Sequence, residues 1–439
     1  MKTKLVQLWI HLRASFWFIP ALMILGSSVL ALFLIELDGN VGINLAEQHP
    51  RIFGANAEGA RNILSSVSSS MISITGVTFS ITIVALSLAS GQYTSRILRN
   101  FMRDRANQVV LGVFLSIFVY CLIVLRTIRG GEHSFVPSLS VVTGIAFGIV
   151  GVAFLIFFIH HVATSIQAST IISRIAKETL AVIEELYPDE QVEEDENPKV
   201  VEECIQCHSW TNVPSLCTGY VQTVDKEGLI EWAEKKEIMA RMTRGIGEFL
   251  IEGKPILTLC QKSPLDEETI ATLASFFSVA SFRTIEQDAA FGIRQLVDIA
   301  LKALSPGVND TTTAVTCLHY LGAILEKLSH RKIPHEICRR NGKIVFIARS
   351  HTYSFFLDEA LHQIRQDAKG SVATYLSMLE TIEAATSPKL SPMRRQALSA
   401  HLQRIKKVSD DQVEDDLDRQ VIQKRFEEVT RILQEKTPA

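Results

Sequence analysis

The sequence predicts an α-helical membrane domain with four transmembrane helices, followed by an α+β cytosolic domain with a small β module and a helical C-terminal region. The chain has 439 residues, of which 47% are hydrophobic, and its mean hydropathy is +0.20. This value is high for a soluble or disordered protein of such length. The hydrophobic residues are concentrated before residue 165, whereas alternating segments and amphipathic helices dominate beyond residue 200.

Charge balance and cysteine content exclude several classes of protein. The chain has 44 basic and 47 acidic residues, and its pI is near 6.5. No global basic excess therefore indicates a nucleic-acid partner. The seven cysteines are scattered and too few for a secreted disulfide scaffold. We expect the lipid bilayer as a partner and no nucleic acid.

Four charge-free runs are each long enough to cross a hydrocarbon core of about 30 Å. The first covers residues 16–35, and its length and the lack of a small-residue cleavage site distinguish it from a signal peptide. The others lie between residues 61 and 96, between 105 and 126, and at 139–159. These runs predict a transmembrane domain over residues 1–165. No Asp, Glu, Lys or Arg lies inside the apolar cores, which argues against a proton-coupled transporter or pump.

Basic residues in the short loops predict the orientation of the helices. The connection between the second and third helices carries four arginines against one acid, and Lys2, Lys4 and Arg13 precede the first helix. We therefore expect both termini in the cytoplasm. The arginines would lie at the inner mouth of a pore and favour anions, although topology and lipid headgroup binding also explain them. This basic cluster consists of Arg96, Arg99, Arg103 and Arg105.

The second apolar helix has an unusual composition for a membrane span. Serine and glycine recur every three, four or seven residues on one side, while Thr75, Thr78 and Thr82 lie almost opposite. Close helix packing explains one such face, because small residues let helices approach and hydroxyls bond to their own backbone. The other face could line a pore, which needs several subunits because four helices cannot enclose water alone. The pore-lining candidates are Ser66, Ser69, Ser73, Gly76, Ser80 and Ser87.

A helical extension and an acidic linker are predicted over residues 166–200. Directly afterwards, Cys204, Cys207 and His208 form a C-x-x-C-H pattern that is typical of c-type haem attachment. Haem is attached outside the cytoplasm, whereas the loop charges place this segment inside. Thiolate and imidazole at close spacing also suit zinc. We expect ordinary reduced cysteines and no cofactor, with zinc binding or thiol chemistry as alternatives.

A small β-rich module is predicted over residues 201–262. Residues 219–224 alternate with period two, residues 225–235 predict a short helix, and residues 238–242 are again strand-like. The glycine-containing segment 245–257 resembles the turn of biotinyl and lipoyl barrel-sandwich domains. It lacks their acceptor lysine hairpin, so no covalent cofactor is expected.

Residues 263–350 predict a helical core with a strand at 343–347, and they hold the densest group of polar residues. In a helix at 285–304 the polar side chains share one broad stripe, in which Arg294 and Asp298 can pair. Asn309 or Asp310 can cap the next helix. Solvent, a subunit interface or a polar or anionic ligand could each face this region. The ligand or interface candidates are Asp288, Arg294, Gln295, Asp298, Asn309 and Asp310.

Residues 351–439 predict C-terminal helices. Amphipathic patterns cover residues 354–367 and 371–385, and two prolines separate them from a charged helical tail. Solvated or subunit-packing helices are the expected role of this region.

Several segments that occur in order across most of the chain carry a resemblance. They are residues 76–81, 85–90, 218–222, 283–284 with Asp288, 291–300 and 303–310. Together they resemble the bacterial predicted-membrane-protein family called domain of unknown function 2254. The resemblance implies an inner-membrane protein with four N-terminal helices and a cytosolic domain, and it implies no established activity. The usual Asn-Asp-Pro of the family is Asn309-Asp310-Thr311 here, and Cys204–His208 is not part of its pattern.

No nucleophile-base motif, Walker loop, kinase signature, metalloprotease histidine pair or dinucleotide fingerprint is present in the sequence, so we do not expect an enzyme. The first hypothesis is a homo-oligomeric ion channel or permeation protein with its second helix near the axis and a cytosolic domain that responds to a ligand or to subunit state. The second is a membrane-anchored cytosolic sensor or scaffold without transport activity. The ion or small ligand is not specified by either hypothesis.

Overall fold

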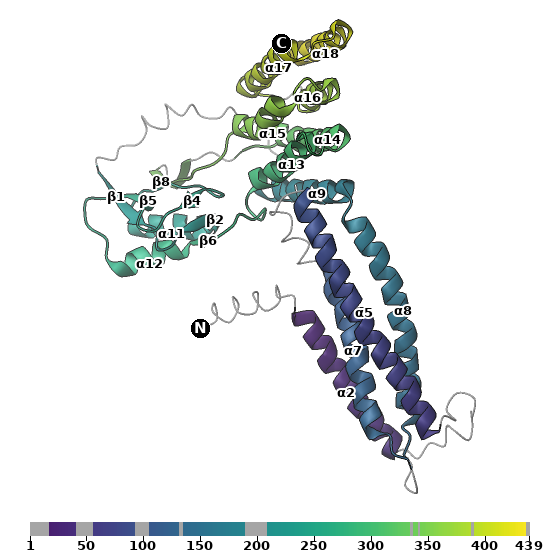
Figure 1. Ribbon diagram of the computed structural model, residues 1–439. Coiled ribbons are helices and arrows are strands. Elements are labelled where there is room, and N and C mark those ends of the chain that lie inside the picture. Colours follow the sequence, from purple (N-terminus) through teal and green to yellow (C-terminus); the bar gives the residue numbers. More distant parts are fainter. Residues whose placement is uncertain are drawn as a thin grey trace. The chain divides into compact units, whose positions relative to one another are not determined.

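The chain folds as two compact units, residues 1–167 and residues 168–439, which we call the N-terminal and C-terminal units (Figure 1). Four helices of the N-terminal unit are long and apolar enough to span a membrane, and small sheets and further helices follow in the C-terminal unit. The predicted fold class is therefore confirmed. The structure, a computed structural model, describes residues 17–40, 56–92, 105–130, 135–188, 209–333, 337–340, 343–387 and 390–435.

The helices of the N-terminal unit run side by side, and α7 packs against the other three (Figure 1). Gly112 of α7 makes a close approach possible, because a Cβ atom there would lie 2.6 Å from Met23 Sδ and 3.2 Å from the Pro20 Cα. Phe114 and Tyr120 of α7 are fully buried. The helices are α2 (Phe18–Asn40), α5 (Ala57–Gln92), α7 (Arg105–Thr127) and α8 (Ser138–Ser165).

Polar contacts tie this unit together at the end where α2 and α7 finish and α5 and α8 begin. The Asp38 carboxylate accepts hydrogen bonds from the Ser140 backbone N–H at 3.1 Å and from the Ser140 hydroxyl at 2.8 Å. The Arg61 guanidinium donates to the Ile128 carbonyl at 2.7 Å. Asp38 thereby supplies the acceptor that the unpaired N–H groups at the start of α8 require.

Two sheets form the β part of the C-terminal unit. The larger has the strand order β1-β5-β3-β8-β7 and the smaller has the order β4-β2-β6. All pairs are antiparallel except β3 with β8, where Ala240 pairs with Phe346. The strands are β1 (Trp210–Pro214), β2 (Gly219–Val224), β3 (Ala240–Met242), β4 (Phe249–Leu250), β5 (Pro255–Cys260), β6 (Phe277–Ala280), β7 (Ile337–Arg340) and β8 (Lys343–Ile347).

The strands expected at residues 219–224 and 343–347 and the short helix after residue 225 are confirmed as β2, β8 and α11. The β structure is nevertheless not restricted to residues 201–262, because β6, β7 and β8 complete the two sheets. The segment 245–257 does not form one local turn, since β4 and β5 join different sheets.

Helices form the rest of the C-terminal unit. Helix α9 packs on α13 and α14, and the pairs α13/α14, α15/α16 and α17/α18 stack on one another (Figure 1). The chain leaves the β part after β6, builds α13 and α14, and returns to it with β7 and β8. The helices are α9 (Ala168–Leu186), α11 (Lys226–Lys236), α12 (Glu267–Ser275), α13 (Ala289–Leu304), α14 (Thr311–Ser329), α15 (Tyr353–Asp367), α16 (Val372–Ala384), α17 (Pro392–Gln412) and α18 (Asp416–Glu435).

Candidate functional site

Helix α5 buries one side and exposes the opposite side within a single chain. Thr75 and Thr78 are 9% and 3% exposed, and Thr82 bonds back to the Thr78 carbonyl at 2.8 Å. The threonine face thus packs inside the unit. All six pore-lining candidates are exposed on the other side: Ser66, Ser69, Ser73, Gly76, Ser80 and Ser87.

Several candidates lie outside the described residues, namely Arg96, Arg99, Arg103, Cys204, Cys207 and His208. Arg105 is described and is the exposed first residue of α7. It lines an apolar cavity of about 450 Å³ together with Phe154 and Phe157 of α8. Among the residues that the structure describes, no group of three or more His, Cys, Asp or Glu side chains is placed to hold a metal ion.

Arg294 and Asp298 on α13 form the expected ion pair, with 2.6 Å between Arg294 Nη2 and Asp298 Oδ1. The same guanidinium donates to Gln363 Oε1 at 2.7 Å and lies 3.5 Å from Glu359 Oε1, both on α15. Gln295 is only 2% exposed, and its Oε1 has no hydrogen-bond partner in the described part of the chain. Arg294 therefore fastens α13 to α15, while Gln295 points into the interior.

The ligand or interface candidates do not gather in one place, because they lie at opposite ends and on different sides of α13. Asp288 precedes the helix, is 3% exposed, and caps it by accepting from the Phe291 backbone N–H at 3.0 Å. Asn309 and Asp310 follow the helix, and Asn309 has a positive φ of 51°. The 16 residues of α13 span about 24 Å at 1.5 Å per residue, too far for one small ligand to contact both Asp288 and Asp310.

Of the two caps that the sequence allows for α14, Asn309 and Asp310, the structure uses Asp310. Its carboxylate accepts from the Thr313 hydroxyl at 2.5 Å and from the Thr313 backbone N–H at 3.0 Å. These hydrogen bonds lower the pKa of Asp310 below its ordinary value of 3.8, so the cap stabilises the fold above that pH.

We expect Asp310→Ala to lower the free energy of unfolding by about 1 kcal/mol at pH 7. Because the folded-state pKa is depressed, this difference should shrink as the pH falls below 3.8 and through that lowered pKa. Thermal unfolding of the wild-type chain and of Asp310→Ala, at neutral and at acidic pH, measures this difference in unfolding free energy. Asp310→Asn keeps an oxygen acceptor and cannot titrate, so it serves as the control. An equal loss at both pH values for Asp310→Ala would contradict the assignment of this cap.

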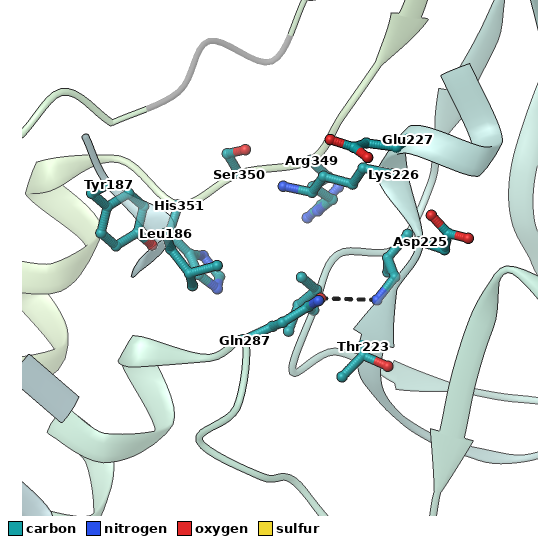
Figure 2. A pocket seen from close by; sticks show the side chains of 12 residues that line it. Leu186, Tyr187, Thr223, Asp225, Lys226, Glu227, Gln287, Arg349, Ser350 and His351 are labelled. Atoms are coloured by element: carbon teal, nitrogen blue, oxygen red, sulfur yellow. Dashed lines mark hydrogen bonds between the residues drawn. The ribbon is translucent and has the colours of Figure 1, made fainter. Parts of the chain in front are cut away.

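A cavity of about 510 Å³ lies in the C-terminal unit, where the β part meets the end of α9, the start of α11 and the segment that precedes α15 (Figure 2). We call it the His351 cavity. Its volume is typical of small-molecule sites. It is lined by Leu186, Tyr187, Thr223, Val224, Asp225, Lys226, Glu227, Ile246, Gln287, Arg349, Ser350 and His351.

One side of the His351 cavity is basic. Lys226 is partly buried at the start of α11, and burial lowers the pKa of its ammonium group. The Arg349 side chain is held in place, because its Nε donates to Glu248 Oε1 at 2.6 Å. Gln287 is also fixed, since its Oε1 accepts from the Val224 backbone N–H at 3.0 Å. Figure 2 shows Lys226, Arg349 and Gln287 among the side chains that line the cavity.

The opposite wall is aromatic. The His351 ring stacks on Phe355, with centroids 4.0 Å apart and planes at 7°. Tyr187 contacts Phe356 edge-on at 6.1 Å. Burial lowers the pKa of His351, with Arg283 adding to this effect and Asp288 opposing it, so the ring is neutral at pH 7. Sequence reasoning missed this site, because its residues come from five separate segments that share no local pattern.

A family model described as "Predicted membrane protein (DUF2254)" matches residues 13–384. Uncharacterized proteins of Mycobacterium tuberculosis (strain CDC 1551 / Oshkosh) and of Mycobacterium bovis (strain ATCC BAA-935 / AF2122/97) are each 30% identical to the chain over 436 residues. Each alignment covers 94% of this chain and 79% of the relative. No solved structure matches the chain.

Proposed function

The chain belongs to the DUF2254 family of predicted membrane proteins. We propose that it is an oligomeric permeation protein of the bacterial inner membrane. In this proposal its four apolar helices cross the bilayer, and its C-terminal unit lies in the cytoplasm as a regulatory domain. The loop arginines support this orientation through the positive-inside rule.

The observation that carries the proposal is the uncovered serine and glycine side of α5. The stripe extends from Ser66 to Ser87, which corresponds to roughly 30 Å along a helix and so to the full hydrocarbon thickness. A contact between two helices needs small residues over only a few turns. A polar stripe along the whole span instead suits a surface that faces either water or the same helix of other subunits.

One subunit cannot enclose a path, because no helix among the described residues of its own unit covers the exposed side of α5. A ring of subunits would place copies of this side around an axis. The basic residues that follow α5 in the sequence, including Arg105, would raise the local anion concentration at the cytoplasmic mouth. We therefore propose small anions as the permeant class.

Leucine at the stripe positions should block the path. We expect Ser73→Leu, Ser80→Leu and Ser87→Leu each to reduce chloride flux into proteoliposomes by roughly tenfold or more, since leucine narrows the path and removes the hydroxyls. The matched control is Ser70→Leu, the same change at an exposed position about a quarter-turn from the centre of the stripe. Unchanged flux in all three variants, or wild-type flux no greater than that of empty vesicles, would overturn the proposal.

The second candidate function is a membrane-anchored cytosolic sensor without transport, and the His351 cavity favours it. The cavity combines a volume of about 510 Å³ with basic and aromatic walls, as small-molecule sites do. If the C-terminal unit binds a ligand but proteoliposomes that contain the protein show no flux, the second candidate is favoured over the first.

A further inference from the structure

We propose that the His351 cavity binds a phosphate monoester attached to a planar ring, a ligand of mononucleotide size, with its phosphate at Lys226 and Arg349 and its ring against His351 and Tyr187. The inference gives the regulatory C-terminal unit its ligand class, and it rests on the proposed function only for the consequence of binding.

The phosphate would lie at the basic side of the cavity, where several N–H groups have no hydrogen-bond acceptor among the described residues. Among the described residues, the Lys226 ammonium has neither a hydrogen-bond nor an ion-pair partner. Arg349 uses its Nε for Glu248, which leaves its two terminal nitrogens for a ligand. The backbone N–H groups of Lys226 and Glu227, in the first turn of α11, have no acceptor within the helix and add to the donor set. Three phosphate oxygens match such a group of donors.

Glu248 already pairs with Arg349, whereas the two acids beside Lys226 form no ion pair with it. The Asp225 carboxylate caps α11 by accepting from the Gly228 backbone N–H at 2.9 Å. Figure 2 places this carboxylate on the side of Lys226 that faces away from His351 and Tyr187. Glu227 is exposed, and no ion pair joins it to Lys226. A dianionic phosphate would therefore supply the charge partner that the partly buried lysine lacks.

The ring end is defined by a fixed aromatic surface. Stacking on Phe355 and an edge contact with Phe356 at 5.9 Å hold the His351 ring in place. A neutral imidazole offers a planar, weakly hydrated face for stacking. Because Gln287 Oε1 accepts from the Val224 backbone, its amide N–H₂ remains to donate into the cavity between the two ends.

The size of the cavity selects against a bare anion. The whole cavity has a volume of about 510 Å³. Inorganic phosphate would occupy only its basic side and would leave the aromatic wall without a contact. A ring attached to the phosphate contacts both sides, so each half contributes to affinity.

Calorimetric titration of the detergent-purified full chain tests the inference, with AMP and flavin mononucleotide as probes and with adenosine, riboflavin and inorganic phosphate as half-ligands. We expect a phosphate-bearing ring to bind and its halves to bind at least roughly tenfold more weakly.

Lys226→Met should weaken binding roughly tenfold or more, and His351→Ala should weaken it while leaving the affinity for inorganic phosphate unchanged. Lys235→Met, an exposed change in the last turn of α11, is the matched control. Thermal unfolding verifies that each variant is folded.

Failure of both phosphate esters to bind at about 1 mM overturns the inference. Equal binding by inorganic phosphate also overturns it, because the ring would then contribute nothing to affinity. Equal binding by adenosine overturns it as well, because the phosphate would then contribute nothing. Wild-type affinity in Lys226→Met also overturns it. Flux is measured separately on the same preparations. Flux without nucleotide binding leaves the permeation proposal intact, whereas binding without flux leaves this inference intact and favours the sensor.

Discussion

Replacing Arg394 by methionine should lower the free energy of unfolding by about 3–5 kcal/mol, because the hydrogen bonds that its buried guanidinium donates to three carbonyls would be lost. Arg394 is 2% exposed. Its Nη1 donates to the carbonyls of Leu328, Ser329 and Arg331 at 3.1, 3.3 and 3.0 Å. These carbonyls lie at and just beyond the end of α14, where the regular hydrogen bonds of a helix run out. The Leu328 carbonyl also accepts from the Arg331 backbone N–H at 3.2 Å. Methionine fills similar space and offers no donor, so the loss reports hydrogen bonding more than packing.

Thermal unfolding of the purified chain, followed by circular dichroism, measures this effect. For a unit of this size, a loss of that magnitude corresponds to a fall in Tm of roughly 10 °C. Arg431→Met removes an exposed arginine from α18 and should change the unfolding free energy by less than about 0.5 kcal/mol. If Arg394→Met proves no more harmful than this control, the guanidinium is not what holds the end of α14.

Replacing Asp288 by alanine should lower the free energy of unfolding by about 2–4 kcal/mol. The carboxylate accepts from Arg283 Nε at 2.9 Å and from Arg283 Nη2 at 3.0 Å, in addition to capping α13. The Arg283 side chain is 23% exposed, so water can solvate part of its charge after the change, which reduces the expected loss. Asp288→Asn keeps a capping oxygen and should cost less than Asp288→Ala.

The same unfolding measurement tests Asp288, with Asp411→Ala as the control, since Asp411 is exposed on α17. Asp288 also supports the loop that carries Ile246 of the His351 cavity. A Cβ atom on Gly247, where φ is 80°, would lie 2.4 Å from Asp288 Oδ2, so the loop passes directly over the carboxylate. A stability loss in Asp288→Ala no larger than that in Asp411→Ala would show that the ion pair and cap contribute little.

The local features of the fold could be predicted from the sequence. Charge-free length alone identifies the four apolar helices, because hydrocarbon thickness sets a minimum span. Residues three and four apart share a helix face, which explains why the Arg294–Asp298 pair and the two faces of α5 were predictable. Asp310 could be predicted as a cap because capping involves residues within one turn.

Features that join distant segments could not be predicted. The parallel pairing of β3 with β8 connects Ala240 to Phe346, and nothing in either short strand specifies its partner. Asp288 is a cap rather than a member of the helix stripe, because the helix begins at Ala289 instead of residue 285. The His351 cavity needs the correct placement of five segments, so periodicity within any one of them gives no indication of it.

The return of the chain to the larger sheet through β7 and β8 has a consequence for synthesis on the ribosome. Strand β3 presents its edge from the moment it pairs with β5, yet β8 is made roughly a hundred residues later, which at about 5–20 residues per second means a delay of roughly 5–20 s. During that interval α13 and α14 are made while the edge of β3 has no neighbour. An unpaired strand edge readily joins another chain. The nascent protein therefore passes through a stage in which pairing with another chain competes with folding.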